Sequence, residues 1–310
     1  MRMPSVRDFS AGPARAIRRA ALADRSLFPY IIDTARGRTL YVPDLDAQKL
    51  REAPFANTYA KQEATFIVSV PWEAGPIVRP RIDADPIYVF SSGRCGSTLL
   101  HNILLSAKIP GISEPHVGGA LISRAYEKHP FARPPLRWAT RTFARDLMSA
   151  VGSNNEPLVV KLRSQFCRAA DALLSKSRER RTIFMIRRFE NWAKSVGQLF
   201  RVTPDFLVTN YNQSIACYAY LRRHSNCHFL RYEDLLEQPH EKMALLSEFL
   251  GRNISRTATE QAMLVGSQKG TGLERVSEQG RARWEAMRDD ALRLFVTSGT
   301  ADFYNQVIET

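Results

Sequence analysis

Tyr88-Val-Phe-Ser-Ser-Gly-Arg-Cys-Gly-Ser-Thr-Leu-Leu100 is the stretch that decides the fold of this 310-residue chain. It joins a run of β-forming residues to a run of apolar residues at helical spacing. Gly93, Arg94 and Gly96 lie between the two. Glycines at such a turn let backbone N–H groups converge on an anion, and the helix N-terminus adds a favourable partial charge. The stretch therefore predicts a phosphate-binding turn.

The turn lacks the order of a Walker A loop, G-x-x-x-x-G-K-[ST], because no lysine follows the second glycine. A P-loop kinase that uses ATP and Mg²⁺ stays open as an alternative. It requires a Walker lysine and an acidic metal ligand near the loop, and the sequence shows neither. The alternative is a generic strand-to-helix turn without a ligand. Such a turn does not require an arginine between two glycines or the two hydroxyl side chains that follow. We therefore favour an anion other than ATP.

Strand-like runs alternate with helical runs from residue 86 onward. The pairs are 87–90 with 98–107, 158–162 with 166–175, 182–186 with 191–200, and 228–230 with 241–250. This alternation predicts an α/β fold, a three-layer sandwich whose central parallel sheet is flanked by helices. Residues 1–85 break the rhythm with repeated prolines. We expect them to form an irregular N-terminal extension packed on the domain of residues 86–310.

Composition limits the partners. The formal net charge is +13, from 44 Lys and Arg against 31 Asp and Glu, and such a field attracts anions. A non-enzymatic basic protein that binds nucleic acid or an anionic surface is thus another alternative, although no nucleic-acid module is recognisable and we expect no nucleic-acid partner. The four cysteines form no C-x-x-C pair, so we expect no metal. Because no apolar run reaches 18 residues, we expect a cytoplasmic protein without a membrane span.

The segment 94–99 resembles the 5′-phosphosulfate loop of sulfotransferases that use 3′-phosphoadenosine 5′-phosphosulfate (PAPS). That loop reads Lys or Arg, Ser, Gly, Thr or Ser, Thr and an apolar residue. Here a cysteine replaces the serine, which removes one hydroxyl donor and leaves the backbone N–H groups. The resemblance implies a P-loop-type fold and donor binding by Arg94, Cys95, Gly96, Ser97 and Thr98.

Two later segments extend the resemblance. Arg187 at a strand end and Ser195 eight residues later keep the family's spacing for residues that bind the 3′-phosphate, although Phe189 replaces the usual proline. The run 267–272 resembles a late basic loop that closes over the same phosphate, with Lys269 and Gly270 as candidates. A flexible surface loop is the alternative for this run.

The segment 230–239 resembles a further stretch of the family that contains Tyr-Glu-Asp-Leu. We assign this stretch a mainly structural role, with Glu233 orienting nearby loop groups. The resemblance thus runs from residue 87 to residue 272 and leaves residues 1–85 outside.

Sulfuryl transfer needs cations that stabilise charge on the transferred group. We expect Arg94 and Lys161 to supply them, the latter because ligands gather at the carboxyl ends of parallel strands. A general base adds ~10²- to 10⁴-fold in rate. Cytosolic relatives use the histidine of a Lys-x-His segment, where this chain has Arg163. We expect Glu114 to replace it, ahead of His116, with the pKa of Glu114 raised if the cleft is dry. The alternative is an acceptor acidic enough to react without a base.

The expected activity is transfer of the sulfuryl group of PAPS to a hydroxyl of a small-molecule or glycan acceptor, without a metal. The sequence leaves the oligomeric state open. Four aromatic residues are candidates for an apolar acceptor pocket, with the protein core as the alternative: Trp138, Phe143, Trp192 and Tyr211.

Overall fold

The computed structural model describes residues 26–33, 36–71, 85–115, 146–151, 157–174, 179–265 and 276–309. They divide into two compact units, each made of two separate stretches of the chain. The first unit comprises Met1–Ile87 and Pro110–Arg180, and the second comprises Tyr88–Ile109 and Arg181–Thr310. The predicted boundary at residue 85, between an extension and a catalytic domain, stays a prediction.

The predicted α/β fold with a central parallel sheet is confirmed. The sheet has five strands in the order β5-β6-β4-β7-β8. In the first unit, β5 (Gly111–Ser113) pairs in parallel with β6 (Val159–Lys161). In the second unit, β7 (Arg181–Ile186) pairs in parallel with both β4 (Ile87–Ser91) and β8 (Asn226–Arg231). All residues of β4 are buried, as expected for a parallel strand covered on both faces.

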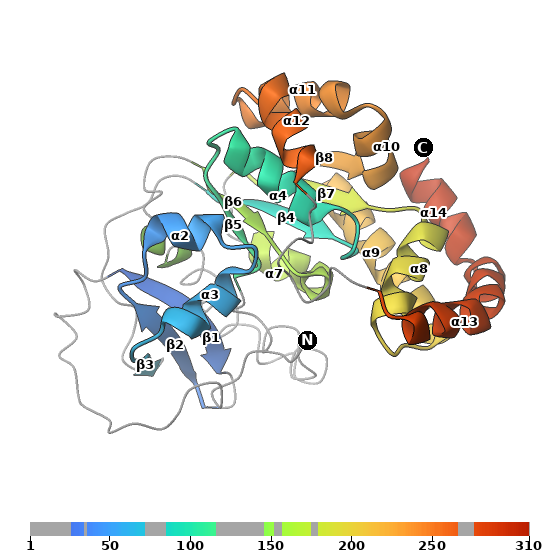
Figure 1. The fold of residues 1–310 in the computed structure, drawn as a ribbon, viewed down its shortest axis with the longest axis horizontal. Helices are drawn as coiled ribbons and strands as arrows, with labels where there is room; N and C mark the ends of the chain where they lie inside the picture. Colours follow the sequence, from blue (N-terminus) through green and yellow to red (C-terminus); the bar gives the residue numbers. More distant parts are fainter. Residues whose placement is uncertain are drawn as a thin grey trace. The chain divides into compact units, whose positions relative to one another are not determined.

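Helices cover both faces of the strands in the second unit. Helix α4 (Ser97–Ser106) packs against α12 (Arg256–Leu264), while α9 (Pro204–His224) packs against β7 and β8. Figure 1 shows α4, α12 and α11 (Pro239–Leu250) on one side of these strands and α9 on the other. Helix α8 (Phe189–Leu199) follows β7, and α10 (Tyr232–Glu237) follows β8. These connections give the layers that the alternating pattern predicts.

The last two helices complete the second unit. Helix α13 (Glu278–Thr297) packs against α8 and α9, and α14 (Thr300–Ile308) packs against α9. Trp284 of α13 is buried, and a Cβ at Gly197 of α8 would lie 2.9 Å from its ring. Arg283 donates to the carbonyls of Gly197 and Gln198 at the end of α8, each at 3.1 Å. The orphan carbonyls at this helix end are thereby satisfied.

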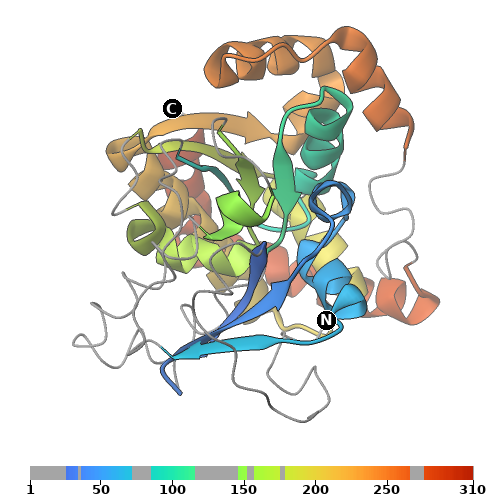
Figure 2. The ribbon, with the colours of Figure 1, turned by 90° about the vertical axis from the view of Figure 1, so that its left-hand side faces the viewer.

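The expectation of an irregular N-terminal extension is corrected for residues 27–71. Strands β1 (Leu27–Asp33), β2 (Arg38–Pro43) and β3 (Val68–Pro71) form an antiparallel sheet (Figure 2). Helices α2 (Ala47–Glu52) and α3 (Ala56–Glu63) connect β2 to β3. The prolines that suggested irregularity occupy positions where a strand tolerates them. Pro29 lies where the register shifts, Pro43 and Pro71 are the last residues of β2 and β3, and Pro54 lies outside the strands, between α2 and α3.

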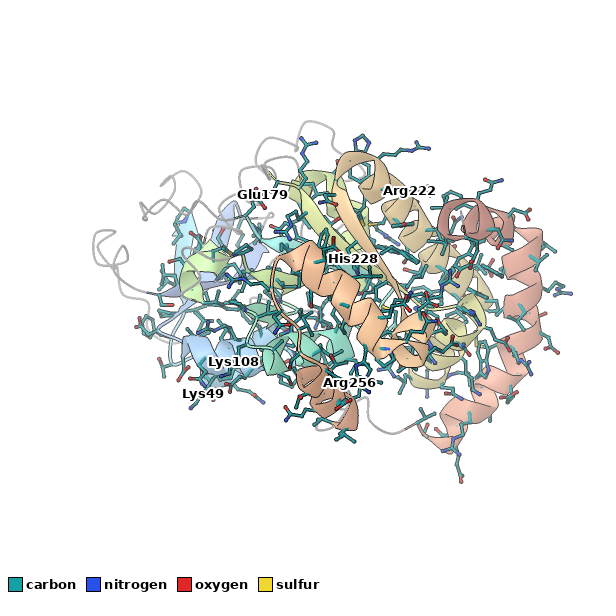
Figure 3. The ribbon with its side chains drawn as sticks, turned by 90° about the horizontal axis from the view of Figure 1, so that it is seen from above. Lys49, Lys108, Glu179, Arg222, His228 and Arg256 are labelled. Carbon is teal, nitrogen blue, oxygen red and sulfur yellow. The ribbon has the colours of Figure 1, made fainter. Side chains whose placement is uncertain are left out.

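The first unit also contains helical residues 146–150 and, after β6, a 3₁₀ helix η4 (Ser164–Ala169) that continues into α7 (Ala170–Leu174). Charged side chains are spread over many elements of both units, as Figure 3 shows for Lys49, Arg222 and Arg256. Among the described residues, no helix is long and apolar enough to cross a bilayer.

Candidate functional site

The loop between β4 and α4 has a left-handed backbone at three positions. The φ angles are 70° at Gly93, 50° at Arg94 and 80° at Gly96. Gly96 caps α4, and a Cβ there would lie 2.2 Å from Cδ2 of Tyr232, closer than real atoms approach. Only glycine satisfies both the angle and the close contact. The backbone of the loop therefore turns tightly just before the N-terminus of α4. In loops of this kind, an anion binds at that helix N-terminus.

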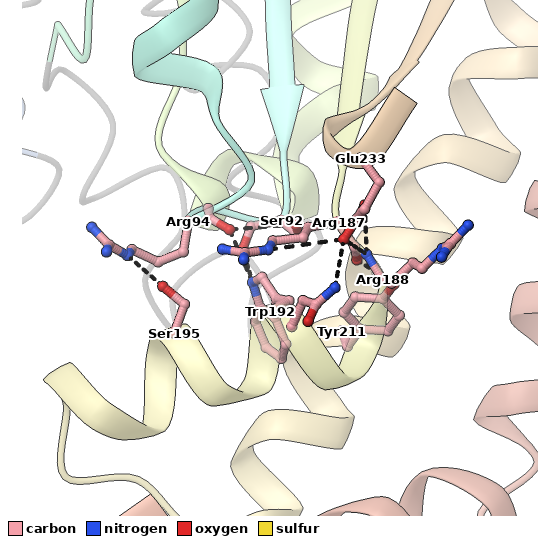
Figure 4. A network of polar contacts seen from close by, with 10 residues as sticks. Ser92, Arg94, Arg187, Arg188, Trp192, Ser195, Tyr211 and Glu233 are labelled. Carbon is pink, nitrogen blue, oxygen red and sulfur yellow. Dashed lines mark hydrogen bonds and ion pairs between the residues drawn. The ribbon is translucent and has the colours of Figure 1, made fainter. Parts of the chain in front are cut away.

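Helix α8 contacts this loop from two successive turns. The indole Nε1 of Trp192 donates to the carbonyls of Ser92 and Gly93, at 3.0 Å and 2.9 Å. One turn later, the Oγ of Ser195 accepts a hydrogen bond from Nε of Arg94 at 3.1 Å (Figure 4). The structure thus brings together Arg94 and Ser195, which lie 101 residues apart in the sequence.

Arg94 and Arg187 form a pair of neighbouring cations. Burial lowers the pKa of Arg94, and the positive charge of Arg187 lowers it further. Among the described residues, Nη1 of Arg94 and Nε of Arg187 are buried and have no hydrogen-bond partner. Two cations with unused donors at a helix N-terminus have the composition of an anion site. These residues therefore fit the phosphate and sulfate groups of PAPS.

Three residues hold Arg187 in place. Its guanidinium lies over the ring of Tyr232, at 4.9 Å from the centroid. Its Nε is 3.9 Å from Oε1 of Glu233, which also accepts from the backbone N–H of Arg188. The hydroxyl of Tyr211 donates to the carbonyl of Arg187 at 2.7 Å. Glu233 thus orients the loop after β7, as expected. The sequence predicts a mainly structural role for Tyr232 and offers Tyr211 as a candidate for an acceptor pocket, and it connects neither with Arg187.

The remaining donor-side candidates lie beside the loop. Cys95 is fully buried, and its thiol donates to the carbonyl of Met185 at 3.5 Å. Its side chain is thus engaged by β7, and its backbone N–H is what it can offer a ligand. Ser97 and Thr98 are buried in the first turn of α4. Lys269 and Gly270 lie outside the described residues, as does His116.

Glu114 belongs to a separate cluster in the first unit, at the carboxyl ends of β5 and β6. Its Oε1 is 2.8 Å from Nζ of Lys161, and its Oε2 is 3.1 Å from Nε of Arg163. Lys161 is 2% exposed, and its ammonium also donates to Oγ of Ser113 at 3.2 Å and lies 5.6 Å from the ring centroid of Phe55. Both carboxylate oxygens of Glu114 therefore face cations.

The expectation that the pKa of Glu114 is raised is wrong. Burial alone raises this pKa, but the charges of Lys161 and Arg163 and their hydrogen bonds outweigh burial and bring it below the ordinary value. Glu114 is therefore ionised at neutral pH. The expectation that Lys161 faces a ligand stays a prediction; in this structure its ammonium is held by Glu114 and Ser113 inside the unit. The sequence missed this pairing because the two partners lie 47 residues apart.

A metal cluster is absent from the part of the chain that the structure describes, where no group of three or more His, Cys, Asp or Glu is placed to hold an ion. The site geometry of the second unit rests on arginines, hydroxyls and backbone groups. Such groups recognise phosphate and sulfate without a metal.

Comparison with known proteins identifies the family of one segment. Residues 169–269, about a third of the chain, match the family model of the sulfotransferase domain. The match contains Arg187, Ser195 and the Tyr-Glu-Asp-Leu stretch, so the predicted family is confirmed over this segment. No curated protein matches the chain.

Solved structures with a similar arrangement are distant. The sulfotransferase domain of the Synechococcus PCC 7002 olefin synthase is 15% identical, with a TM-score of 0.39, over 70% of this chain and 95% of that one. Sulfotransferase STF1 of Mycobacterium tuberculosis H37Rv is 14% identical, with a TM-score of 0.39, over 67% and 76%. Mouse sulfotransferase SULT7A1, complexed with PAP, is 10% identical, with a TM-score of 0.38, over 72% and 84%.

Proposed function

We propose that this chain, whose residues 169–269 belong to the sulfotransferase domain family, transfers the sulfuryl group of PAPS to a hydroxyl of an acceptor. The observation that carries the proposal is the pair Arg94 and Arg187, two adjacent cations with buried, unpartnered N–H groups beside the N-terminus of α4. A bound dianion compensates their mutual repulsion, because it supplies the opposite charge that the described residues around Arg94 lack.

We assign the two ends of PAPS to the two arginines. Arg94 and the backbone N–H groups of residues 95–98 bind the 5′-phosphosulfate, where the left-handed loop meets α4. Arg187 and Ser195 bind the 3′-phosphate. Lys269 and Gly270 remain predicted contacts of that phosphate.

The proposed reaction is a displacement at sulfur. The acceptor oxygen forms a bond to sulfur while the bond from sulfur to the bridging oxygen of the 5′-phosphate breaks. The products are a sulfate ester and adenosine 3′,5′-bisphosphate (PAP), which keeps the electron pair of the broken bond. The hydroxyl proton of the acceptor passes to a base or to water. Arg94 offsets negative charge that develops on the leaving phosphate and the transferred group.

The base remains a proposal with two candidates. Glu114 is ionised and can accept a proton only in competition with Lys161 and Arg163, which hold its two oxygens. That competition makes it a weaker base than an isolated carboxylate. His116 is the alternative base, because the ordinary pKa of a histidine, about 6.5, suits proton transfer near neutral pH. A pH–rate profile with an inflection near 6.5 supports His116, and a profile that is flat from pH 5 to 8 supports the carboxylate.

Two measurements test the proposed function. Calorimetric titration is expected to show PAP binding that Arg94→Met weakens, and tight binding of ATP–Mg²⁺ without affinity for PAP would instead indicate a kinase. Mass spectrometry of a panel of hydroxyl compounds, including phenols, alcohols and glycans, incubated with enzyme and PAPS should show the gain of one sulfuryl group. If PAP binds and no compound gains sulfate, the donor site stands and the transferase activity does not.

The acceptor and the location are finer proposals. We propose a small-molecule or glycan acceptor, because a protein with a net charge of +13 can bind an anionic acceptor and does not repel a neutral one. We also propose a cytoplasmic location. Its support is that all four cysteines, which lie within the described residues, are thiols.

A further inference from the structure

Trp192 is a side chain of the donor site to which the proposed reaction gives no role. It is 2% exposed and lies on α8, three residues before Ser195. Residues at this spacing share one face of a helix. The two side chains therefore contact the same short segment, since Trp192 donates to the carbonyls of Ser92 and Gly93 and Ser195 accepts from Arg94. Consecutive residues of the loop are thus fixed by one helix face.

The direction of these carbonyls determines the direction of the next N–H groups. A trans peptide unit is planar, and its C=O and N–H point in opposite directions. When the carbonyl of Gly93 points toward Trp192, the N–H of Arg94 points away from α8. The orientation of this peptide unit, which directly precedes the proposed backbone donors of residues 95–98, therefore depends on the indole.

The loop also needs an external restraint. Arg94 has a φ of 50°, in a region that residues with a Cβ rarely occupy. A strained backbone persists where the surrounding contacts determine it. Trp192 is itself rigid, because it packs against Tyr211 and Phe189 with ring centroids at 5.1 Å and 6.1 Å.

We infer that Trp192 is a positioning residue that holds the loop in its anion-binding conformation through its indole N–H. The inference rests on the proposed donor site, and it concerns the 5′ side alone. Arg187 is held by Tyr211 and Glu233 instead, and the position of Ser195 is set by the backbone of α8, so loss of the indole N–H leaves the 3′ side in place.

The test compares Trp192→Phe with Trp284→Phe, a matched loss of a buried indole that packs against α8 away from the loop. The probes are PAP, adenosine 5′-monophosphate and adenosine 3′-monophosphate, titrated by calorimetry. Trp192→Phe should weaken PAP and the 5′-monophosphate by the same factor, about fivefold to tenfold for one lost hydrogen bond, and leave the 3′-monophosphate unchanged. Trp284→Phe should change none of the three.

An unchanged PAP affinity in Trp192→Phe, or equal weakening of all three probes, overturns the inference. If the wild-type chain binds no PAP, the proposed function fails first. If Trp192→Phe does not fold, the indole N–H resonance of Trp192 in the wild-type chain provides the answer, assigned by elimination with variants of the other three tryptophans, Trp72, Trp138 and Trp284. It should shift on adding the 5′-monophosphate and stay in place with the 3′-monophosphate. A resonance that responds to neither nucleotide contradicts the assigned role.

Discussion

Replacement of Arg94 by methionine should separate ligand binding from stability. The side chain keeps its length and apolar stem, while the guanidinium is lost together with its hydrogen bond to Ser195. A charge-assisted hydrogen bond to phosphate stabilises by ~1.5–3 kcal/mol. We therefore expect the Kd for PAP to rise by about 10- to 150-fold.

The ligand-free protein should respond differently to the same change. Loss of the hydrogen bond to Ser195 destabilises by about 1 kcal/mol. Removal of a half-buried cation beside Arg187 acts in the opposite direction, because partial burial and that charge both oppose the ionised form of Arg94. The two effects offset each other, so the free energy of unfolding should stay within about 1 kcal/mol of the wild-type value.

Thermal unfolding with and without PAP measures both quantities. Saturating ligand at 100 times its Kd adds ~2.7 kcal/mol to the wild-type chain, and the variant should gain much less at the same concentration. Arg188→Met is the matched control, since Arg188 is exposed and its backbone N–H, not its side chain, binds Glu233. PAP affinity within threefold of wild type in Arg94→Met would refute the reasoning. So would a loss of more than about 2 kcal/mol in the free chain, which would identify the guanidinium as a structural group.

Three further substitutions have defined outcomes. Gly96→Ala should destabilise by more than about 2 kcal/mol and abolish PAP binding, whereas Gly251→Ala, at a φ of 64° with open space around it, should lose only ~1 kcal/mol in chemical denaturation. Glu114→Gln should leave Lys161 buried without its counter-ion and lose ~3 kcal/mol at pH 7 with unchanged PAP affinity. Because the folded pKa of Glu114 is lowered, its contribution is complete above about pH 4.3 and disappears as pH falls through the folded pKa, so denaturation curves of variant and wild type should converge in acid. Cys95→Ser should leave the Kd for PAP within twofold, because that side chain faces β7; a larger gain in affinity would show that the hydroxyl reaches the ligand.

The sheet could be predicted from the sequence because its strands are short apolar runs next to helical periodicity, as in β4 and α4. The antiparallel sheet of residues 27–71 could not, because its prolines coincide with a register shift and with strand ends. Whether a proline breaks a strand or ends it depends on the partner strand. That partner is known only from the pairing of β1 with β2.

The places of the candidate donor residues in the fold were predictable because they follow strands, as Arg187 follows β7. The residues that hold them were not. Tyr232 packs against Gly96, although it lies 136 positions later in the sequence. Trp192 donates to the carbonyl of Gly93, which lies 99 positions earlier. The pKa of Glu114 has the same origin, since its direction depends on two cations from β6 and the residues after it.

The cluster of Glu114, Lys161 and Arg163 differs from the pair Arg94 and Arg187 in how its charges are balanced. Residue type distinguishes the two less, because both contain cations. Lys161 and Arg163 share a carboxylate that takes hydrogen bonds from both, so their charges are already balanced within the first unit. Arg94 is half-buried and has a hydroxyl and another cation for neighbours, and its Nη1 has no hydrogen-bond partner among the described residues. A fold tolerates a buried cation without a counter-ion only where a ligand completes the site or where the stability lost is small. Arg94 thus lacks the counter-ion that Glu233 gives Arg187 and that Glu114 gives Lys161 and Arg163, so Arg94 is the cation that the proposed anionic donor stabilises most.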